Sequence, residues 1–293
     1  MMNIPKPKIS INIAIPASLG LQVKNKMIRT YIIGMIGRFA AIFRVDNIII
    51  YRDNDDAGLV RNQSYIEDIL KYMATPQYLR KIMMPKRRIF RYIGVLPPLQ
   101  SPNHPKFKPI SKIKNGEYRE GVITGCKENK YEVYIGLDKP IFLHVTERKH
   151  KVGEKLIFKV RSTKRRDIKV QVVNKDDISY YWCYSVERFD GSLKKLITKK
   201  RPYYGLIIGT SRWGKSITMV ENNLRNDLKI KKSLLMIFGG FNAGIYDILN
   251  VKKGSEIKDF DYVINFFPNQ GTKTIRTEEA ISGSLSIINK LIS

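Results

Sequence analysis

Two glycine-bearing loops near the end of the chain carry the residues best suited to binding a small polar ligand. The first spans 238–247 and the second 265–274, and each follows a short apolar segment typical of a buried strand. Glycine has no Cβ, so its backbone can approach a ligand closely. Ligands in open α/β sheets bind at the carboxyl ends of strands. Either loop alone is explained as an ordinary turn, but together they predict one pocket lined by backbone N–H and C=O groups.

A third candidate site lies at residues 209–216, Gly-Thr-Ser-Arg-Trp-Gly-Lys-Ser, which match the P-loop pattern of nucleotide hydrolases. In such a loop Lys215 would bind the β- and γ-phosphates and Ser216 would bind Mg²⁺. P-loop enzymes also need an acidic residue at the end of a second apolar strand. The strand predicted at Leu234–Phe238 ends in two glycines instead. A P-loop NTPase is therefore the less favoured hypothesis.

The charge of the chain indicates a polyanionic partner. Its 293 residues include 53 Lys and Arg against 26 Asp and Glu, a formal net charge of +27. Basic proteins that neutralise phosphates release condensed counterions, which drives their binding to nucleic acid. A solvated basic surface or an anionic membrane surface would be the alternatives. No apolar run reaches the roughly 18 residues that a membrane-spanning helix needs, so no segment is expected to span a bilayer, and nucleic acid, with no membrane, is the expected partner.

Few residues are available for metal or disulfide chemistry. The cysteines, Cys126 and Cys183, form no CxxC pair, and the three histidines are scattered along the chain. We therefore expect neither a bound metal nor a disulfide framework. Met1–Lys8 lacks the apolar core of a secretory signal, so the expected location is cytoplasmic.

The segments around these candidate sites alternate between strand and helix, as in an α/β sheet. Apolar periodicity predicts a helix over Lys24–Phe43 between strands at Ile9–Pro16 and Asn47–Tyr51. Further helices are predicted to begin at Asn62 and at Thr75-Pro76. The same alternation returns after Asp177, with predicted strands at Tyr180–Ser185, Tyr203–Ile208, Leu234–Phe238 and Asp261–Phe267 and a helix at Thr277–Leu291.

A different kind of segment separates these two parts. After the proline-rich residues 97–105 come five short strand-like stretches, at Gly121–Thr124, Tyr131–Gly136, Pro140–Val145, Lys155–Val160 and Ile168–Val173. Five short strands predict a small OB-like β-barrel, a fold that often binds nucleic acid. The predicted organisation is one α/β domain formed by residues 1–98 and 178–293, with the barrel inserted at 99–177. The predicted RNA-binding residues are Arg148, Lys149, Lys164, Arg165 and Arg166, for which a solvated charged rim is the alternative.

Several motifs resemble those of one family. Gln270-Gly271-x-x-Thr274-x-Arg276-Thr277-Glu278-Glu279-Ala280 resembles the knot motif of SPOUT (α/β-knot) methyltransferases. Residues 37–45, Gly-Arg-Phe-Ala-Ala-Ile-Phe-Arg-Val, resemble the first motif of that superfamily, and residues 275–280 are similar to the Leu-Arg-Thr-Glu-x-Ala signature of bacterial ribosomal-RNA uridine-N3 methyltransferases. Gly209-Thr210-Ser211 resembles a feature of the archaeal and eukaryotic RNA methyltransferases that carry an inserted OB-like domain. The resemblance covers nearly the whole chain.

This resemblance implies a fold and an activity. The fold would be a SPOUT α/β knot with a C-terminal trefoil knot and an inserted OB-like barrel, and the protein would be a homodimer. The cofactor would be S-adenosylmethionine, and the substrate would be RNA, most simply ribosomal RNA methylated at uridine N3. A non-catalytic RNA-binding protein with a degenerate knot domain is the alternative.

The resemblance also assigns roles to residues by matching position. Arg38 or Arg276 would stabilise the negative charge that develops on uridine O2 and O4, and Glu278 or Glu279 would act as a base, although helix capping competes for both. The implied cofactor-binding residues are Gly239, Gly240, Gly244, Phe266, Gln270, Gly271, Thr274, Ile275 and Thr277.

Overall fold

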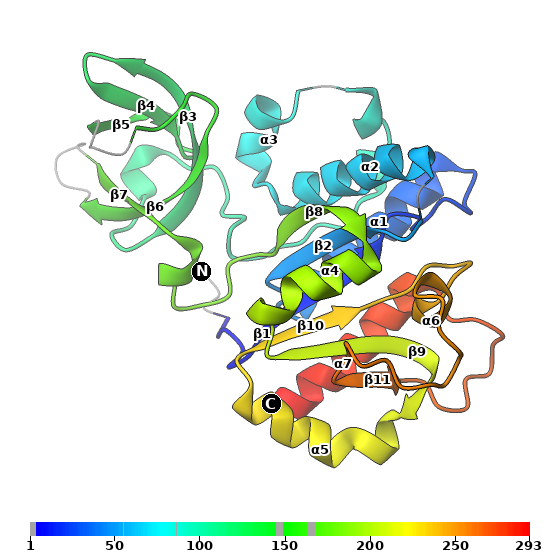
Figure 1. The fold of residues 1–293 in the computed structure, drawn as a ribbon. Coiled ribbons are helices and arrows are strands. Elements are labelled where there is room, and N and C mark those ends of the chain that lie inside the picture. The colour runs from blue at the N-terminus through cyan, green and yellow to red at the C-terminus, as the bar shows by residue number, and fades with distance from the viewer. Residues whose placement is uncertain (1–3, 55, 86, 145–148, 163–167) are drawn as a thin grey trace. The chain divides into compact units, whose positions relative to one another are not determined.

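The computed structural model describes residues 4–54, 56–85, 87–144, 149–162 and 168–293. The chain packs as two compact units, each built around its own sheet (Figure 1). The parallel-sheet unit comprises Lys6–Met73, Ile89–Leu99 and Cys183–Ser293. The antiparallel-sheet unit comprises Ala74–Arg88, Gln100–Trp182 and the described residues of Met1–Pro5.

Both ends of the chain build the parallel sheet, whose strand order is β11-β9-β10-β1-β2-β8. Every neighbouring pair is parallel. The strands are β1 (Ser10–Pro16), β2 (Asn47–Arg52), β8 (Ser185–Ser192), β9 (Leu206–Ser216), β10 (Ser233–Ile237) and β11 (Tyr262–Asn265). The inner strands β1, β2 and β10 are almost entirely apolar and buried, as a sheet covered on both faces requires.

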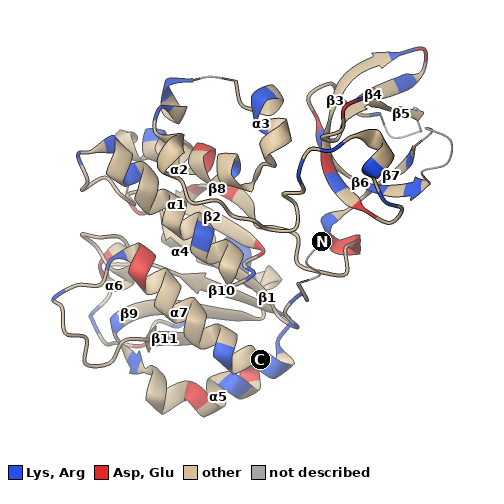
Figure 2. Cartoon of the chain, turned by 180° about the vertical axis from the view of Figure 1, so that it is seen from behind, with Lys and Arg blue, Asp and Glu red and all other residues tan. Residues whose placement is uncertain are grey.

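Helices cover both faces of this sheet. Apolar residues of α4 (Leu193–Lys200) and α6 (Ile245–Ile248) form one core with Ile49, Ile207 and Leu235 of the strands. On the other face α7 (Thr277–Ile292) contacts α1 (Lys26–Ile42) and α5 (Ile217–Ile230), as the two opposite views show (Figures 1 and 2). The fold is therefore a mixed α/β fold with a parallel sheet, as predicted.

The antiparallel-sheet unit is a curled five-stranded sheet in the order β5-β4-β3-β6-β7. Its core contains Ile123, Val133 and Phe158. The strands are β3 (Tyr118–Lys127), β4 (Lys130–Tyr134), β5 (Ile141–His144), β6 (Lys155–Ser162) and β7 (Lys169–Val173), so the five predicted stretches are all present with shifted ends. A Cβ on Gly121 would lie 2.9 Å from the Tyr134 carbonyl oxygen. Glycine at this position therefore lets β3 and β4 approach each other closely.

The division into units differs from the predicted boundaries mainly at Ala74–Arg88. The predicted boundaries at 98/99 and 177/178 compare with 99/100 and 182/183 in the structure. Residues 74–88 include α3 (Gln77–Met83), and they pack with the antiparallel sheet instead of with the first half of the chain. The Tyr78 hydroxyl donates to the Glu120 carbonyl (2.8 Å), and Asn103 Nδ2 donates to the Ala74 carbonyl (2.7 Å).

Two local predictions were wrong. The helix predicted to begin at Asn62 is α2 (Ala57–Ala74), which places Asn62 inside it. Asn62 is buried, and its Nδ2 donates to the carbonyls of Ala17 (2.6 Å) and Leu19 (3.0 Å), so it holds the loop after β1 instead of capping a helix. The strand predicted at Tyr180–Ser185 forms only from Ser185 onward.

Short connecting elements complete the fold. The 3-10 helices are η1 (Arg88–Phe90), η2 (Ile93–Val95), η3 (Ile110–Lys112), η5 (Lys175–Asp177) and η6 (Arg201–Tyr203). In the part of the chain that the structure describes, no helix is both long and apolar enough to cross a membrane.

Candidate functional site

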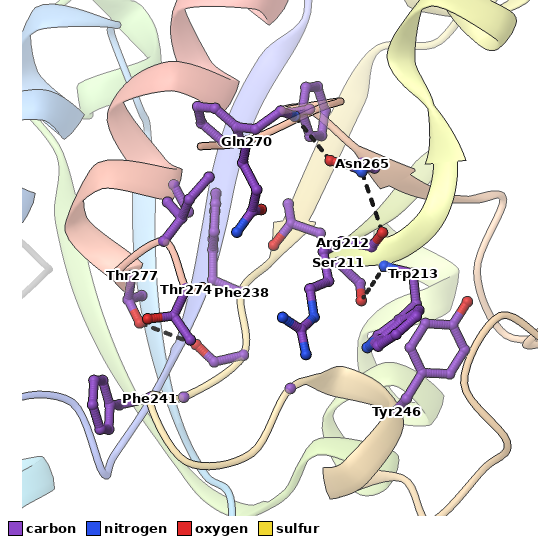
Figure 3. Close-up of a pocket in the computed structure, with 18 of the residues that line it drawn as sticks. Ser211, Arg212, Trp213, Phe238, Phe241, Tyr246, Asn265, Gln270, Thr274 and Thr277 are labelled. Carbon is purple, nitrogen blue, oxygen red and sulfur yellow. Dashed lines mark hydrogen bonds between the residues drawn. The ribbon is translucent and has the colours of Figure 1, made fainter. Parts of the chain in front are cut away.

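A cavity of about 310 Å³ lies at the carboxyl ends of β9, β10 and β11 (Figure 3). Because these strands are parallel, the segments that follow them meet at one edge of the sheet. The Thr210 hydroxyl donates to the Ile237 carbonyl (3.1 Å), which joins the ends of β9 and β10. From β2, the buried Tyr51 hydroxyl donates to the Phe238 carbonyl (2.8 Å) and fixes the start of the first loop.

The first loop, residues 238–244, folds back tightly on itself. The Gly240 N–H donates to the Ala243 carbonyl (2.9 Å). A Cβ on Gly239 would lie 2.9 Å from Gly244 Cα, and a Cβ on Gly240 would lie 2.8 Å from Ser18 Oγ. The backbone approach excludes a larger side chain at Gly239, and both glycines line the cavity.

The second loop, residues 265–275, is held by its own polar side chains. Asn265 Oδ1 accepts from the Phe267 N–H (2.9 Å), and Gln270 Nε2 donates to the Thr272 carbonyl (2.8 Å). At the start of α7 the Thr277 hydroxyl donates to the Gly239 carbonyl (3.2 Å). The two loops and α7 therefore form one continuous wall of the cavity.

Eight of the nine predicted cofactor-binding residues line this cavity: Gly239, Gly240, Gly244, Phe266, Gln270, Thr274, Ile275 and Thr277. Gly271 is not among the lining residues, and a Cβ added there would meet no atom within 4 Å. The structure thus brings together segments that lie far apart in the sequence. Their assignment to a cofactor remains a prediction.

The three predicted catalytic residues do not line the cavity. Arg38 Nη1 donates to the carbonyls of Pro98 (2.9 Å) and Leu99 (2.7 Å). Arg276 is exposed at the start of α7, where its backbone N–H donates to Glu279 Oε2 (2.9 Å). Burial raises the pKa of Glu278, the adjacent Glu279 raises it further, and its own N–H and Arg276 partly offset this.

The predicted RNA-binding residues are placed only in part. Lys149 is exposed, whereas Arg148, Lys164, Arg165 and Arg166 lie outside the described residues. Lys and Arg occur on elements of both units (Figure 2). Within the described residues no group of three or more His, Cys, Asp or Glu side chains could hold a metal ion.

The P-loop-like segment is extended. Residues 206–216 form β9, in which Lys215 and Ser216 pair with Ile264 and Asn265 of β11 before α5 begins. A Cβ on Gly214 would collide with the Val263 carbonyl, so this glycine permits close approach of two strands. Residues 210–213 line the cavity, but Lys215 and Ser216 are paired in the sheet instead of lying in a phosphate-binding loop.

Sequence reasoning missed several residues of the cavity. Arg212 and Trp213 line it from the end of β9, and Tyr246 lines it from α6. Ser284 of α7 also lines it, and its fully buried hydroxyl has no hydrogen-bond partner among the described residues. The signal nearest to them in the sequence was the adjacent Gly209-Thr210-Ser211 resemblance, which was not assigned to the site.

A parallel α/β sheet with a polar cavity at the carboxyl ends of three strands is the architecture of a ligand-binding α/β protein. Residues 10–288 match the family described as "Putative RNA methyltransferase", and the chain belongs to this family. It is therefore an RNA methyltransferase, an enzyme that uses a methyl-donor cofactor, which confirms the resemblance to RNA methyltransferases found in the sequence.

Relatives of known name are similar over nearly the whole chain. The 28S rRNA (uridine-N(3))-methyltransferase of Drosophila melanogaster is 30% identical over 98% of this chain and 63% of its own length. The human protein of the same name is 28% identical over 95% of this chain and 77% of its own length. A protein of Haloarcula marismortui, whose name states no function, is 29% identical over 96% of this chain and 99% of its own length.

Proposed function

We propose that this protein transfers the methyl group of S-adenosylmethionine to N3 of a uridine in ribosomal RNA. The observation that carries this proposal is the cavity at the ends of β9, β10 and β11, lined by the two glycine loops of an RNA methyltransferase. The names of the Drosophila and human relatives support uridine N3 of ribosomal RNA as the target.

The residues present fit such a cofactor. Small-molecule pockets commonly enclose about 300–1,000 Å³, and this cavity of about 310 Å³ falls at the lower end of that range. Aromatic Phe238 and Phe266 suit an adenine ring, while Gln270 and Thr274 offer polar groups. The unpartnered Ser284 hydroxyl gives a ligand one buried polar contact. When bound, the cofactor supplies an electrophilic methyl group on a sulfonium sulfur.

We further propose that the C-terminal part forms the trefoil knot of SPOUT proteins and that the protein is a homodimer. The jump in pairing along β9, from Gly209 opposite Val263 to Lys215 opposite Ile264, and the link from α7 back to the first loop support the knot. Exposed apolar side chains on α1 support the dimer, because a second copy would cover them; they are Met27, Ile28, Tyr31 and Ile42.

The antiparallel-sheet unit is proposed to be an OB-like barrel that docks the RNA. Its five antiparallel strands and the net charge of +27 support this role. Phosphate contacts would hold the RNA while the cavity presents the cofactor to one base.

Analysis of nucleosides tests the proposal. Ribosomal RNA from a strain lacking the gene should lack one N3-methyluridine, and expression of the wild-type protein should restore it, as measured by mass spectrometry. Purified protein with S-adenosylmethionine should add the same methyl group in vitro. Appearance of a different methylated nucleoside would refute uridine N3, and RNA binding without any cofactor binding would favour the non-catalytic alternative.

A further inference from the structure

Arg212 stands at the mouth of the cavity on a fixed backbone. Its carbonyl accepts from Asn265 Nδ2 (3.2 Å), and the N–H of the next residue, Trp213, donates to Ser211 Oγ (3.2 Å). The end of β9 is thereby held against β11. The side chain of Arg212 reaches from this anchor toward the interior of the cavity (Figure 3).

The guanidinium of Arg212 is oriented by two contacts. Its Nη1 donates to the Lys273 carbonyl in the second loop (2.9 Å), and its Cζ lies 4.9 Å from the centroid of the Trp213 ring. A cation over an indole is held by the electrostatic attraction of the ring face. The planar group is thus positioned between the second loop and Trp213.

Most of the hydrogen-bonding capacity of this guanidinium is unused. An arginine side chain has five N–H donors, and in the described part of the chain only the bond to Lys273 occupies one of them. The nearby carboxylate of Asp247 is already engaged by Lys253 Nζ (2.9 Å) and by the Gly244 N–H (3.0 Å). The charge of Arg212 is therefore available to a ligand.

Among the arginines that the structure describes, Arg212 alone lines the cavity. Arg38 uses its Nη1 on two backbone carbonyls, and Arg276 is exposed outside the lining. The proposed reaction needs a positive group beside the target base. Lys253 and Lys273 also line the cavity, but Lys253 is paired with Asp247, and Arg212 alone of the three offers a planar set of donors.

We infer that Arg212 and Trp213 form the subsite of the target uracil, in which Trp213 stacks on the base and Arg212 donates to one of its carbonyl oxygens. This inference rests on the proposed function. The indole is 48% exposed although Arg212 lies over it, so the ring keeps exposed surface for contact with a planar base. A carboxylate of the cofactor would bind the guanidinium of Arg212 but not the indole face of Trp213, whereas a uracil base would use both.

The chemistry of the transfer gives Arg212 its role. The N3–H bond breaks and its proton passes to solvent, the N3 electron pair forms the bond to the methyl carbon, and the carbon–sulfur pair returns to sulfur as a neutral thioether. Before the new bond forms, negative charge spreads over O2 and O4 of the uracil. A guanidinium that donates to one of these oxygens, from the side away from N3, stabilises this charge in the transition state and lowers the pKa of the bound N3–H.

Arg212→Ala tests the inference, with Lys215→Ala as the matched control. Lys215 is an exposed cation of the same strand that does not line the cavity. Two quantities are measured on folded full-length protein with unchanged melting temperature. The first is the affinity for S-adenosylhomocysteine without RNA, by calorimetry. The second is the rate of methyl transfer against pH, with ribosomal RNA from the deletion strain.

For Arg212→Ala we expect S-adenosylhomocysteine affinity within about threefold of the wild type and transfer at neutral pH lowered by roughly 10²–10³, as for the loss of one such donor elsewhere. The difference in transfer rate between Arg212→Ala and the wild type should shrink as pH rises, because ionisation of N3–H then depends less on the guanidinium. The transfer rate of Arg212→Lys should lie between those of the wild type and Arg212→Ala, since lysine keeps the charge but not the planar donors. Lys215→Ala should match the wild type.

Three results would overturn the inference while leaving the proposed function intact. They are a tenfold or greater loss of S-adenosylhomocysteine affinity, a transfer deficit equal at every pH, or undiminished transfer by Arg212→Ala. The first would assign Arg212 to the cofactor. If the wild-type protein itself forms no N3-methyluridine, the proposed function fails, and this inference fails with it.

Discussion

Replacement of Arg38 by alanine separates a packing role from a catalytic one. Arg38 lies on the face of α1 that meets the segment before Gln100, to which it donates two hydrogen bonds. One turn earlier, a Cβ on Gly34 would lie 2.7 Å from Leu96 Cδ2, so the helix and this segment are already in tight contact. The Arg38 side chain therefore secures a packed junction within the parallel-sheet unit.

The size of the effect follows from these contacts. A hydrogen bond from a charged donor contributes about 1.5–3 kcal/mol. Arg38 is only half-buried and one acceptor is exposed, so we assign about 2 kcal/mol to the two bonds together. For a unit of this size each kcal/mol corresponds to about 2–4 °C in Tm. Arg38→Ala should thus lower the Tm by about 4–8 °C.

Differential scanning calorimetry measures this shift, with Arg61→Ala on α2 as an exposed control. Methyl transfer by Arg38→Ala should fall only in proportion to the loss of folded protein. An unchanged Tm with transfer reduced by roughly 10²–10³ would refute this reasoning. It would instead support the catalytic role that the family resemblance implies for Arg38.

Three further predictions concern the cavity, the sheet and the dimer. Gly239→Ala should weaken S-adenosylmethionine binding at least tenfold in calorimetry because its Cβ meets the facing loop backbone at 2.9 Å, whereas Gly271→Ala, in open space, should bind normally. Burial alone would raise the pKa of Asp261, but hydrogen bonds from Arg201 and from a backbone N–H lower it overall. The ionised carboxylate therefore stabilises the folded protein above the unfolded-state pKa, and this stabilisation is lost as the pH falls through the lower folded-state pKa. Asp261→Asn should therefore flatten the acid limb of Tm against pH, and an unchanged limb would contradict this assignment. Tyr31→Lys on the exposed stripe of α1 should convert a homodimer to monomer in analytical ultracentrifugation; a wild-type monomer at micromolar concentration would argue against the dimer.

The sequence was most informative where the signal was local. The five short strands between residues 118 and 173 follow from alternating apolar residues and the turns between them. The two glycine loops followed from glycines directly after apolar runs, and the structure places them at one cavity. In each case the cause lies within about ten residues of chain.

Prediction failed where a side chain's partner lies far away in sequence. Asn62 has the chemistry of a helix cap, but its partners are the carbonyls of Ala17 and Leu19. The hydrogen bonds from Arg38 to the Pro98 and Leu99 carbonyls likewise join distant segments and were not expected from the sequence, while its catalytic role stays a prediction. Such partners depend on packing between distant segments, which periodicity and spacing do not encode.

By itself, the sequence determined the α/β class, the inserted group of five strands, the basic character and the glycine loops. Only the tertiary structure decided the strand order β11-β9-β10-β1-β2-β8 and, with it, which residues share the cavity. Pairing with β11 fixes Gly209, Lys215 and Ser216 in the sheet instead of in a phosphate loop, and Arg212 between them lies beside the second glycine loop. The physical reason is that strands far apart in the sequence pair in the order that buries both faces of the sheet. The local sequence of residues 209–216 is compatible with a strand or with a loop, so it does not determine this order.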